Sequence, residues 1–195
     1  QMVTDGASAL VLFSENPPLD NRPTYAVLFG RDGSLVETKK DLGDIGWVRA
    51  GSRGEGSGYV VVAHTYGTSK ASFGGFFLTH QLVKKSAIAF GNGGSLYATS
   101  GAPVWDGSAF VFFYVAYVDA DTDVETRMVR LSAQGKVLED GLAMKPDLYM
   151  RLSSTGVRAF AGTGTTLLVY GKTAEASDWE TRDFYLYLRA GHAPA

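Results

Sequence analysis

The chain contains no cysteine among its 195 residues, which excludes disulfides, thiolate metal sites and a cysteine nucleophile. Charge is also scarce, because Asp, Glu, Lys and Arg together make up 19% of the residues and the net charge is −2. This composition offers no basic stripe for a phosphate backbone, so no nucleic-acid partner is expected. No apolar run approaches the roughly 20 residues of a membrane helix, so no membrane span is expected either.

Helical patterning and catalytic motifs are missing as well. No window of about ten residues carries apolar side chains at i, i+3, i+4 and i+7. There is no Gly-x-Ser-x-Gly elbow, and His64, His80 and His192 are too scattered along the sequence to indicate a metal cluster. The sequence therefore predicts no cofactor. The missing catalytic signature favours a protein that is not an enzyme, without deciding the question.

What the chain does have is glycine, aromatic residues and a repeat. Its 24 glycines and 12% aromatic content are typical of short strands joined by tight turns. Four apolar strands follow turn residues and begin about 50, 50 and 57 residues apart, at 9–13, 59–63, 109–113 and 166–170. This spacing is typical of β-propeller blades, in which each segment would be the second of four antiparallel strands. A sandwich of two stacked sheets is the alternative.

The remaining strands of each unit can also be assigned. Weaker strands at 46–50, 95–99 and 148–152 place Trp47, Tyr97 and Tyr149 on the expected innermost strands. Third strands are expected at 24–30, 73–79, 126–132 and 182–189, and turns at 31–34 and 133–136 lead to fourth strands. The sequence thus predicts an all-β fold of four-stranded blades, as a single propeller segment with repeats at about 1–44, 45–93, 94–146 and 147–195.

The third unit carries a resemblance to a known family. Its residues 105–113 give an Asp-Gly turn and an apolar strand, and residues 127–138 give a strand that ends in Ser-Ala-Gln-Gly and continues into Val-Leu. This order resembles secreted bacterial β-propeller-like repeat proteins. The resemblance implies propeller blades and a secreted or cell-surface location, and it implies no particular reaction.

A five-residue segment occurs twice with four identities, at 123–127 and 178–182, and enters the third strand both times. We expect its Asp123 and Asp178, and its Arg127 and Arg182, to occupy equivalent positions on neighbouring blades. The two copies are candidates for a rim that binds a polar ligand, because Arg presents a planar fork to carboxylates. Repetition nevertheless favours a structural ion pair within each blade.

Two tryptophans are candidates for stacking on a carbohydrate or peptide ligand. Trp105 is expected at the turn between first and second strands, and Trp179 in the loop between second and third strands, although packing is the default role for each.

A calcium site is the one metal alternative. Asp119, Asp121 and Asp123 alternate as in the first half of a calcium loop, but Val124 replaces the expected Gly and Arg130 the expected Glu. A solvated polar loop is therefore favoured over calcium.

The ends of the chain give the last expectation. Strand counting gives three, four, four and three, with the first strand of unit one missing or reduced to residues 1–3. An unpaired edge invites pairing with another chain, so we expect an incomplete propeller that a second polypeptide completes. A compact ring of four modified blades is the alternative. The chain also lacks a signal-like start at Gln1, which indicates that an upstream segment was removed or that it is one piece of a longer product.

The function predicted from these features is a secreted or surface binding and scaffold module, one part of a larger propeller. The alternative is a hydrolase or lyase with its site in the central funnel, because residues drawn from several blades leave no motif. A purely structural subunit of a larger assembly is a third possibility.

Overall fold

The computed structural model describes the chain in segments: residues 1–14, 23–45, 47–54, 56–65, 72–90, 96–97, 102–117, 124–143, 158–162, 165–173 and 182–190. Every regular element in these segments is a β-strand, and none of them contains a helix. All strand pairs are antiparallel. The predicted all-β class is therefore confirmed.

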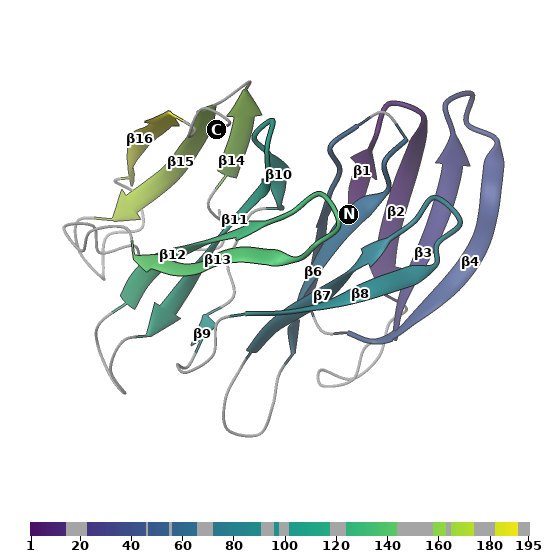
Figure 1. Cartoon of the computed structure of the whole chain (residues 1–195), viewed down its shortest axis with the longest axis horizontal. Coiled ribbons are helices and arrows are strands. Elements are labelled where there is room, and N and C mark those ends of the chain that lie inside the picture. The colour runs from purple at the N-terminus through teal and green to yellow at the C-terminus, as the bar shows by residue number, and fades with distance from the viewer. Residues whose placement is uncertain are drawn as a thin grey trace.

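The strands form four separate sheets, which lie side by side with sheet A at one end and sheet D at the other (Figure 1). Sheet A contains β1 (Met2–Thr4), β2 (Ser8–Ser14), β3 (Pro23–Gly30) and β4 (Leu35–Asp44). Sheet B contains β5 (Trp47–Gly51), β6 (Tyr59–Thr65), β7 (Ser72–Leu78) and β8 (Lys84–Phe90). Sheet C contains β9 (Leu96–Tyr97), β10 (Val104–Trp105), β11 (Phe110–Tyr117), β12 (Val124–Leu131) and β13 (Val137–Ala143). Sheet D contains β14 (Arg158–Gly162), β15 (Thr165–Thr173) and β16 (Arg182–Ala190).

Each sheet follows the order of the chain, as expected for blades. The four apolar segments of the repeat lie in β2, β6, β11 and β15, and each of these strands is the second of its sheet. No second strand pairs with the second strand of another sheet. Trp47 and Tyr97 lie on the first-strand edges of sheets B and C, as predicted, whereas Tyr149 falls outside the described residues.

The first strands differ from the prediction in three units. In sheet A the strand is the short β1, which pairs with β2 from Met2 to Thr4. This agrees with the expected reduced strand at residues 1–3, and it gives the first unit four strands where the strand count expected three. In sheet C it consists of two short pieces, and Trp105 lies on β10 opposite Phe110 instead of in the turn. In sheet D it is β14, because residues 158–162 pair with β15; the predicted strand at 148–152 lies outside the described residues.

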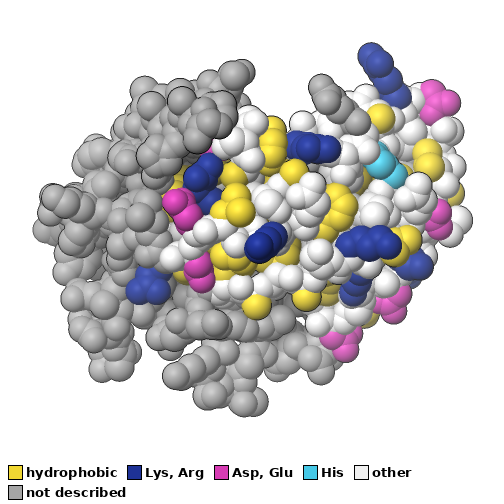
Figure 2. All heavy atoms as spheres, in the orientation of Figure 1, with side chains coloured by type: hydrophobic (Ala, Val, Ile, Leu, Met, Phe, Trp, Pro, Cys, Tyr) yellow, Lys and Arg dark blue, Asp and Glu magenta, His cyan; other side chains and the backbone are white. Residues whose placement is uncertain are grey.

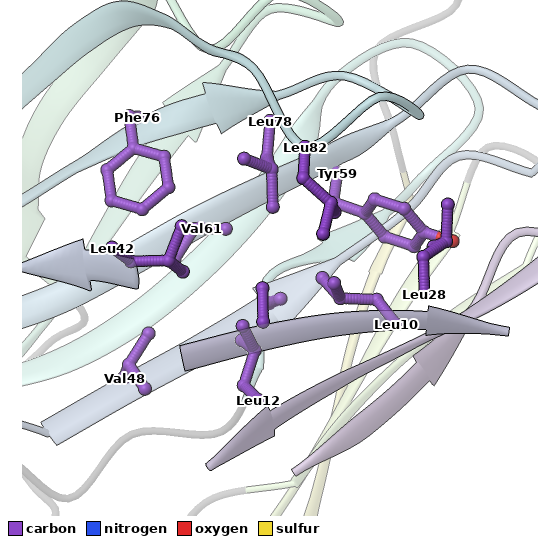
Figure 3. Close-up of a cluster of buried hydrophobic side chains, with 12 residues drawn as sticks. Leu10, Leu12, Leu28, Leu42, Val48, Tyr59, Val61, Phe76, Leu78 and Leu82 are labelled. Carbon is purple, nitrogen blue, oxygen red and sulfur yellow. The ribbon is translucent and has the colours of Figure 1, made fainter. Parts of the chain in front are cut away.

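Sheets A, B and C pack face to face through alternating side chains of β6. Tyr59 and Val61 point into a cluster with Leu10 and Leu28 of sheet A (Figure 3). Val60 and Val62 belong to a second cluster with Phe112 and neighbouring residues of sheet C. Successive strand residues point to opposite faces, so a central sheet needs apolar residues at every position of such a strand. Residues 59–63 are accordingly almost fully buried, and each large side chain contributes roughly 1.5–3 kcal/mol by leaving water.

The other face of sheet A has the same apolar character but lacks a covering sheet in the described part of the chain. It presents Ala9, Val11, Phe13, Tyr25, Val27 and Phe29, which pair across β2 and β3 and are half-buried. The ring centroids of Phe13 and Tyr25 lie 5.7 Å apart, and the Lys39 ammonium lies 3.7 Å from the Tyr25 ring centroid. We call these six residues the outer face of sheet A.

Candidate functional site

The first strands of sheets A, B and C line an open depression of about 600 Å³, which we call the funnel. Its wall is made of three stretches of chain, at residues 1–6, 50–54 and 102–105. Two of them approach closely, since a Cβ at Gly51 would overlap the carbonyl oxygen of Pro103. Volumes of roughly 300–1,000 Å³ are typical of small-ligand sites, so this funnel is the candidate site of the molecule.

The Asp5 turn closes one side of the funnel. Asp5 Oδ1 accepts hydrogen bonds from the Ala7 and Ser8 amides at 3.0 and 2.7 Å, and from the Ser8 hydroxyl at 3.1 Å. Gly6 follows with φ 85°, a conformation that glycine adopts without strain. The carboxylate therefore builds the turn from β1 to β2, and its side chain is fully buried.

The second oxygen of Asp5 faces the neighbouring sheet. His80, in the turn from β7 to β8, places Nδ1 3.4 Å from Asp5 Oδ2, and His80 Nε2 bonds to the Gly56 carbonyl. Tyr59 OH lies 2.8 Å from the Ser8 hydroxyl, and its ring meets the His80 ring edge-on. Burial raises the pKa of Tyr59 to about 12 despite the Ser8 hydrogen bond.

These residues include the types of a serine hydrolase triad, but their order differs. In a triad the imidazole lies between the hydroxyl and the carboxylate, whereas here Asp5 lies between Ser8 and His80. Both nitrogens of His80 already face oxygen acceptors, and Ser8 is buried. The cluster can therefore join sheets A and B but has no imidazole placed to activate Ser8.

Sheet C repeats the turn with a different partner for the carboxylate. Asp106 Oδ1 accepts from the Ser108 amide, the Ser108 hydroxyl and the Ala109 amide at 2.8–2.9 Å, and Arg130 lies 3.9 Å from its other oxygen. Burial alone would raise the pKa of Asp106, but these hydrogen bonds and the Arg130 charge outweigh it and hold the pKa below its ordinary value. Arg130 comes from β12 of the same sheet, so the positive charge that faces the Asp106 carboxylate belongs to sheet C itself.

Of the predicted ligand-binding residues, the structure places one in the funnel wall. Trp105 lines the funnel and packs edge-on against Phe110, with the ring centroids 5.1 Å apart. Trp179, Asp123 and Asp178 lie outside the described residues, as do Asp119 and Asp121 of the predicted calcium loop. Arg182 begins β16, where only its backbone position is described.

Arg127 takes a structural position away from the funnel wall. It lies on β12 opposite Tyr114, whose hydroxyl donates to Asp140 at 3.0 Å. Burial and then the Asp140 carboxylate raise the pKa of Tyr114, against the effect of Arg127. Arg182 instead lies opposite Thr173, the last residue of β15, whereas Tyr114 lies within β11. Thr173 and Arg182 border residues 174–181, which lie outside the described part of the chain, so the expected equivalence of the two arginines stays a prediction.

The residues that sequence analysis missed are Arg53 and His80. Arg53 is an exposed residue of the funnel wall, in a glycine-containing segment that carries no motif. His80 gave no signal because its partner Asp5 belongs to another repeat. The available clue in the sequence is the Asp-Gly pair at 5–6, which is typical of a turn before an apolar strand.

The described residues contain no group of three or more His, Asp or Glu side chains arranged to hold a metal ion. They also contain no helix with the length and apolarity needed to span a membrane.

Comparison with solved structures shows a likeness of fold. The fold is similar to a crystal structure of the acylaminoacyl peptidase of Pyrococcus horikoshii, with a TM-score of 0.51 and 13% identity. The match covers 96% of this chain but only 30% of the peptidase chain. No protein-family model and no curated protein matches the sequence. The likeness shows a shared all-β fold, and the chain spans less than a third of the solved protein's length.

Proposed function

We propose that this chain is a binding and scaffold module, secreted or displayed at a surface, that forms part of a larger propeller. A second polypeptide supplies a further antiparallel sheet against the outer face of sheet A. The funnel between the first strands is the binding site of the module.

The observation that carries the proposal is the outer face of sheet A. Sheet B has apolar residues on both faces of β6 and is covered on both. Sheet A presents a comparable row on β2 and β3, with Val11 opposite Val27, yet no described sheet covers it. Uncovered contiguous apolar surface of this kind marks interaction sites. The match to less than a third of the solved chain is consistent with a fold that continues beyond these four sheets.

The test is the native mass of the isolated chain. Without its partner sheet, the outer face should pair with a second copy, so the mass should exceed the 20.9 kDa of one chain. Val27→Lys places a charge on the outer face and should restore the single-chain mass. Val36→Lys is the matched control, because Val36 is already exposed on β4, and it should leave the assembly unchanged. A folded wild-type monomer at all concentrations would contradict the proposal.

A hydrolase is the second candidate, because the matched structure is that of an acylaminoacyl peptidase. Against it, the funnel wall contains only one carboxylate among its described residues, and that group is held in the Asp5 turn. The test is hydrolysis of chromogenic peptide anilides by purified protein. Turnover that disappears in Ser8→Ala, with the circular dichroism spectrum unchanged, would favour the hydrolase over the binding module.

A further inference from the structure

We infer that the funnel binds a small carboxylate with an apolar body, whose acid group pairs with Arg53 and whose body lies against the wall at Val104 and Trp105. This inference names the ligand class of the site in the proposed function and rests on that proposal.

Most polar side chains of the wall are engaged in the protein itself. The Thr4 hydroxyl donates to the Ser8 carbonyl at 2.9 Å and accepts from the Gly6 amide at 3.1 Å. The Ser52 hydroxyl donates to the Gly58 carbonyl at 2.9 Å and accepts from the Gly54 amide at 3.1 Å. These hydroxyls fix the turns around the funnel and leave little capacity for a ligand.

The Gln1 side chain is engaged as well. Its Oε1 accepts from the Ala50 amide at 2.9 Å, and its Nε2 donates to the Ala50 carbonyl at 3.2 Å. The amide therefore pairs with the free edge of β5 as a neighbouring strand would. This pairing joins sheets A and B at the funnel and removes another polar group from the wall.

The remaining charged side chains of the wall are Asp5 and Arg53, and they differ in availability. Asp5 is buried and faces His80. Arg53 is exposed at the wall, and no described residue forms an ion pair or hydrogen bond with its side chain. A guanidinium presents parallel N–H donors that match a carboxylate in two hydrogen bonds. The charge available to a ligand is therefore positive.

The third stretch of the wall is apolar. Residues 102–105 are Ala, Pro, Val and Trp, and both Val104 and Trp105 are half-buried and line the funnel. Phe110 supports the indole edge-on, so the ring has a fixed orientation. Small-ligand sites typically combine such apolar lining with a few polar groups that set orientation. One acid group joined to an apolar body matches this wall.

Isothermal titration calorimetry with 3-phenylpropionate tests the inference directly. The acid should bind, and its neutral amide should bind at least about tenfold more weakly, because the amide cannot form the charge-assisted pair with the guanidinium. Acetate and inorganic phosphate are the controls for charge alone and should also bind at least about tenfold more weakly. The peptides Gly-Gly-Phe and Gly-Gly-Phe-amide distinguish a peptide end from a free small acid as the source of the carboxylate.

Variants locate the site. Arg53→Gln should lose at least about tenfold in affinity for 3-phenylpropionate, and Trp105→Leu should weaken binding of the same acid while leaving acetate unchanged. Arg31→Gln is the matched control, because Arg31 is exposed in the turn from β3 to β4 and is absent from the wall. The inference would be overturned by equal binding of 3-phenylpropionate and its amide, or by unchanged affinity for the acid in Arg53→Gln. It would also be overturned if neither 3-phenylpropionate nor Gly-Gly-Phe binds.

Native mass is measured on the same samples. If the assembly behaves as proposed but the carboxylates do not bind, only the ligand inference fails. If the carboxylates bind Arg53 in a chain that is monomeric at all concentrations, the ligand inference stands and the proposed assembly fails.

Discussion

His80 Nδ1 lies 3.4 Å from Asp5 Oδ2, and this contact joins the β7–β8 turn of sheet B to the β1–β2 turn of sheet A. That carboxylate oxygen is buried and accepts no hydrogen bond from the described residues. A buried oxygen without a polar neighbour is costly, so the imidazole is the group that makes this turn compatible with the sheet interface.

His80→Phe should destabilise the protein by about 1–3 kcal/mol, because it keeps a ring at the interface but leaves the Asp5 oxygen alone. The free energy of unfolding in urea measures this loss. A double-mutant cycle with Asp5→Asn isolates the contact, and coupling within about 0.5 kcal/mol of zero would show that the two side chains act independently.

Gly51→Ala should disturb the packing of sheet B against the chain before β10, which forms the funnel wall, rather than the hydrogen bonds within one sheet. A Cβ at this position overlaps the Pro103 carbonyl, so β5 and the chain before β10 must separate. We expect a lower melting temperature and loss of 3-phenylpropionate binding. Gly74→Ala is the control within sheet B: its Cβ would meet the Ile88 carbonyl at 3.1 Å, a tight contact away from the funnel wall. Unchanged affinity for 3-phenylpropionate in Gly51→Ala would show that the Pro103 backbone can shift without altering the binding site.

Tyr59→Phe should reduce an alkaline loss of stability. The pKa of Tyr59 is raised by burial from 10.0 to about 12, so between these values the unfolded phenol ionises while the folded one stays neutral. Wild-type stability therefore falls as the pH rises through this window. The variant should lose less stability over this window, and the remaining loss comes from Tyr114, whose pKa is also raised. It should lose about 1 kcal/mol at neutral pH with the Ser8 hydrogen bond. Tyr25→Phe keeps Tyr59 in place and should keep the slope.

Asp106→Asn should flatten the acid side of the stability profile. The folded pKa lies below the ordinary value of 3.8, so the ionised group stabilises the fold above that pH. The contribution is lost as the pH falls through the folded pKa. The variant should be less stable at neutral pH and lose less stability toward low pH, as followed by urea unfolding. Asp44→Asn, at the exposed end of β4, should leave the acid profile close to wild type.

The second strands could be predicted from sequence because they are rich in β-branched and aromatic residues and follow turns that contain glycine. The short first strands could not. Two residues at Val104 and Trp105 show no alternation, and the preceding Pro103 resembles the start of a turn. In sheet D the small side chains of β14 gave a weaker pattern than residues 148–152, although β14 is the strand that pairs with β15.

The site was less predictable for a different reason. Asp5 and Asp106 each precede a glycine, a pattern typical of turns, but the side chain that faces each carboxylate comes from a distant part of the chain. Arg53 carries no motif, and its placement in the funnel wall follows from how three sheets pack. Such contacts depend on tertiary arrangement, which residue spacing alone does not encode.

The two Asp-Gly turns make their sheets unequal as modules. Asp106 obtains its cation from Arg130 of the same sheet, so sheet C brings a complete turn wherever it is placed. Asp5 depends on His80 of the next sheet, so sheet A carries a buried carboxylate that only this neighbour accommodates. If such sheets are duplicated or exchanged during evolution, sheet C keeps the partner of its buried carboxylate in any position. Sheet A keeps that partner only when sheet B remains its neighbour. The Asp5 carboxylate therefore favours retention of the first two sheets as a pair.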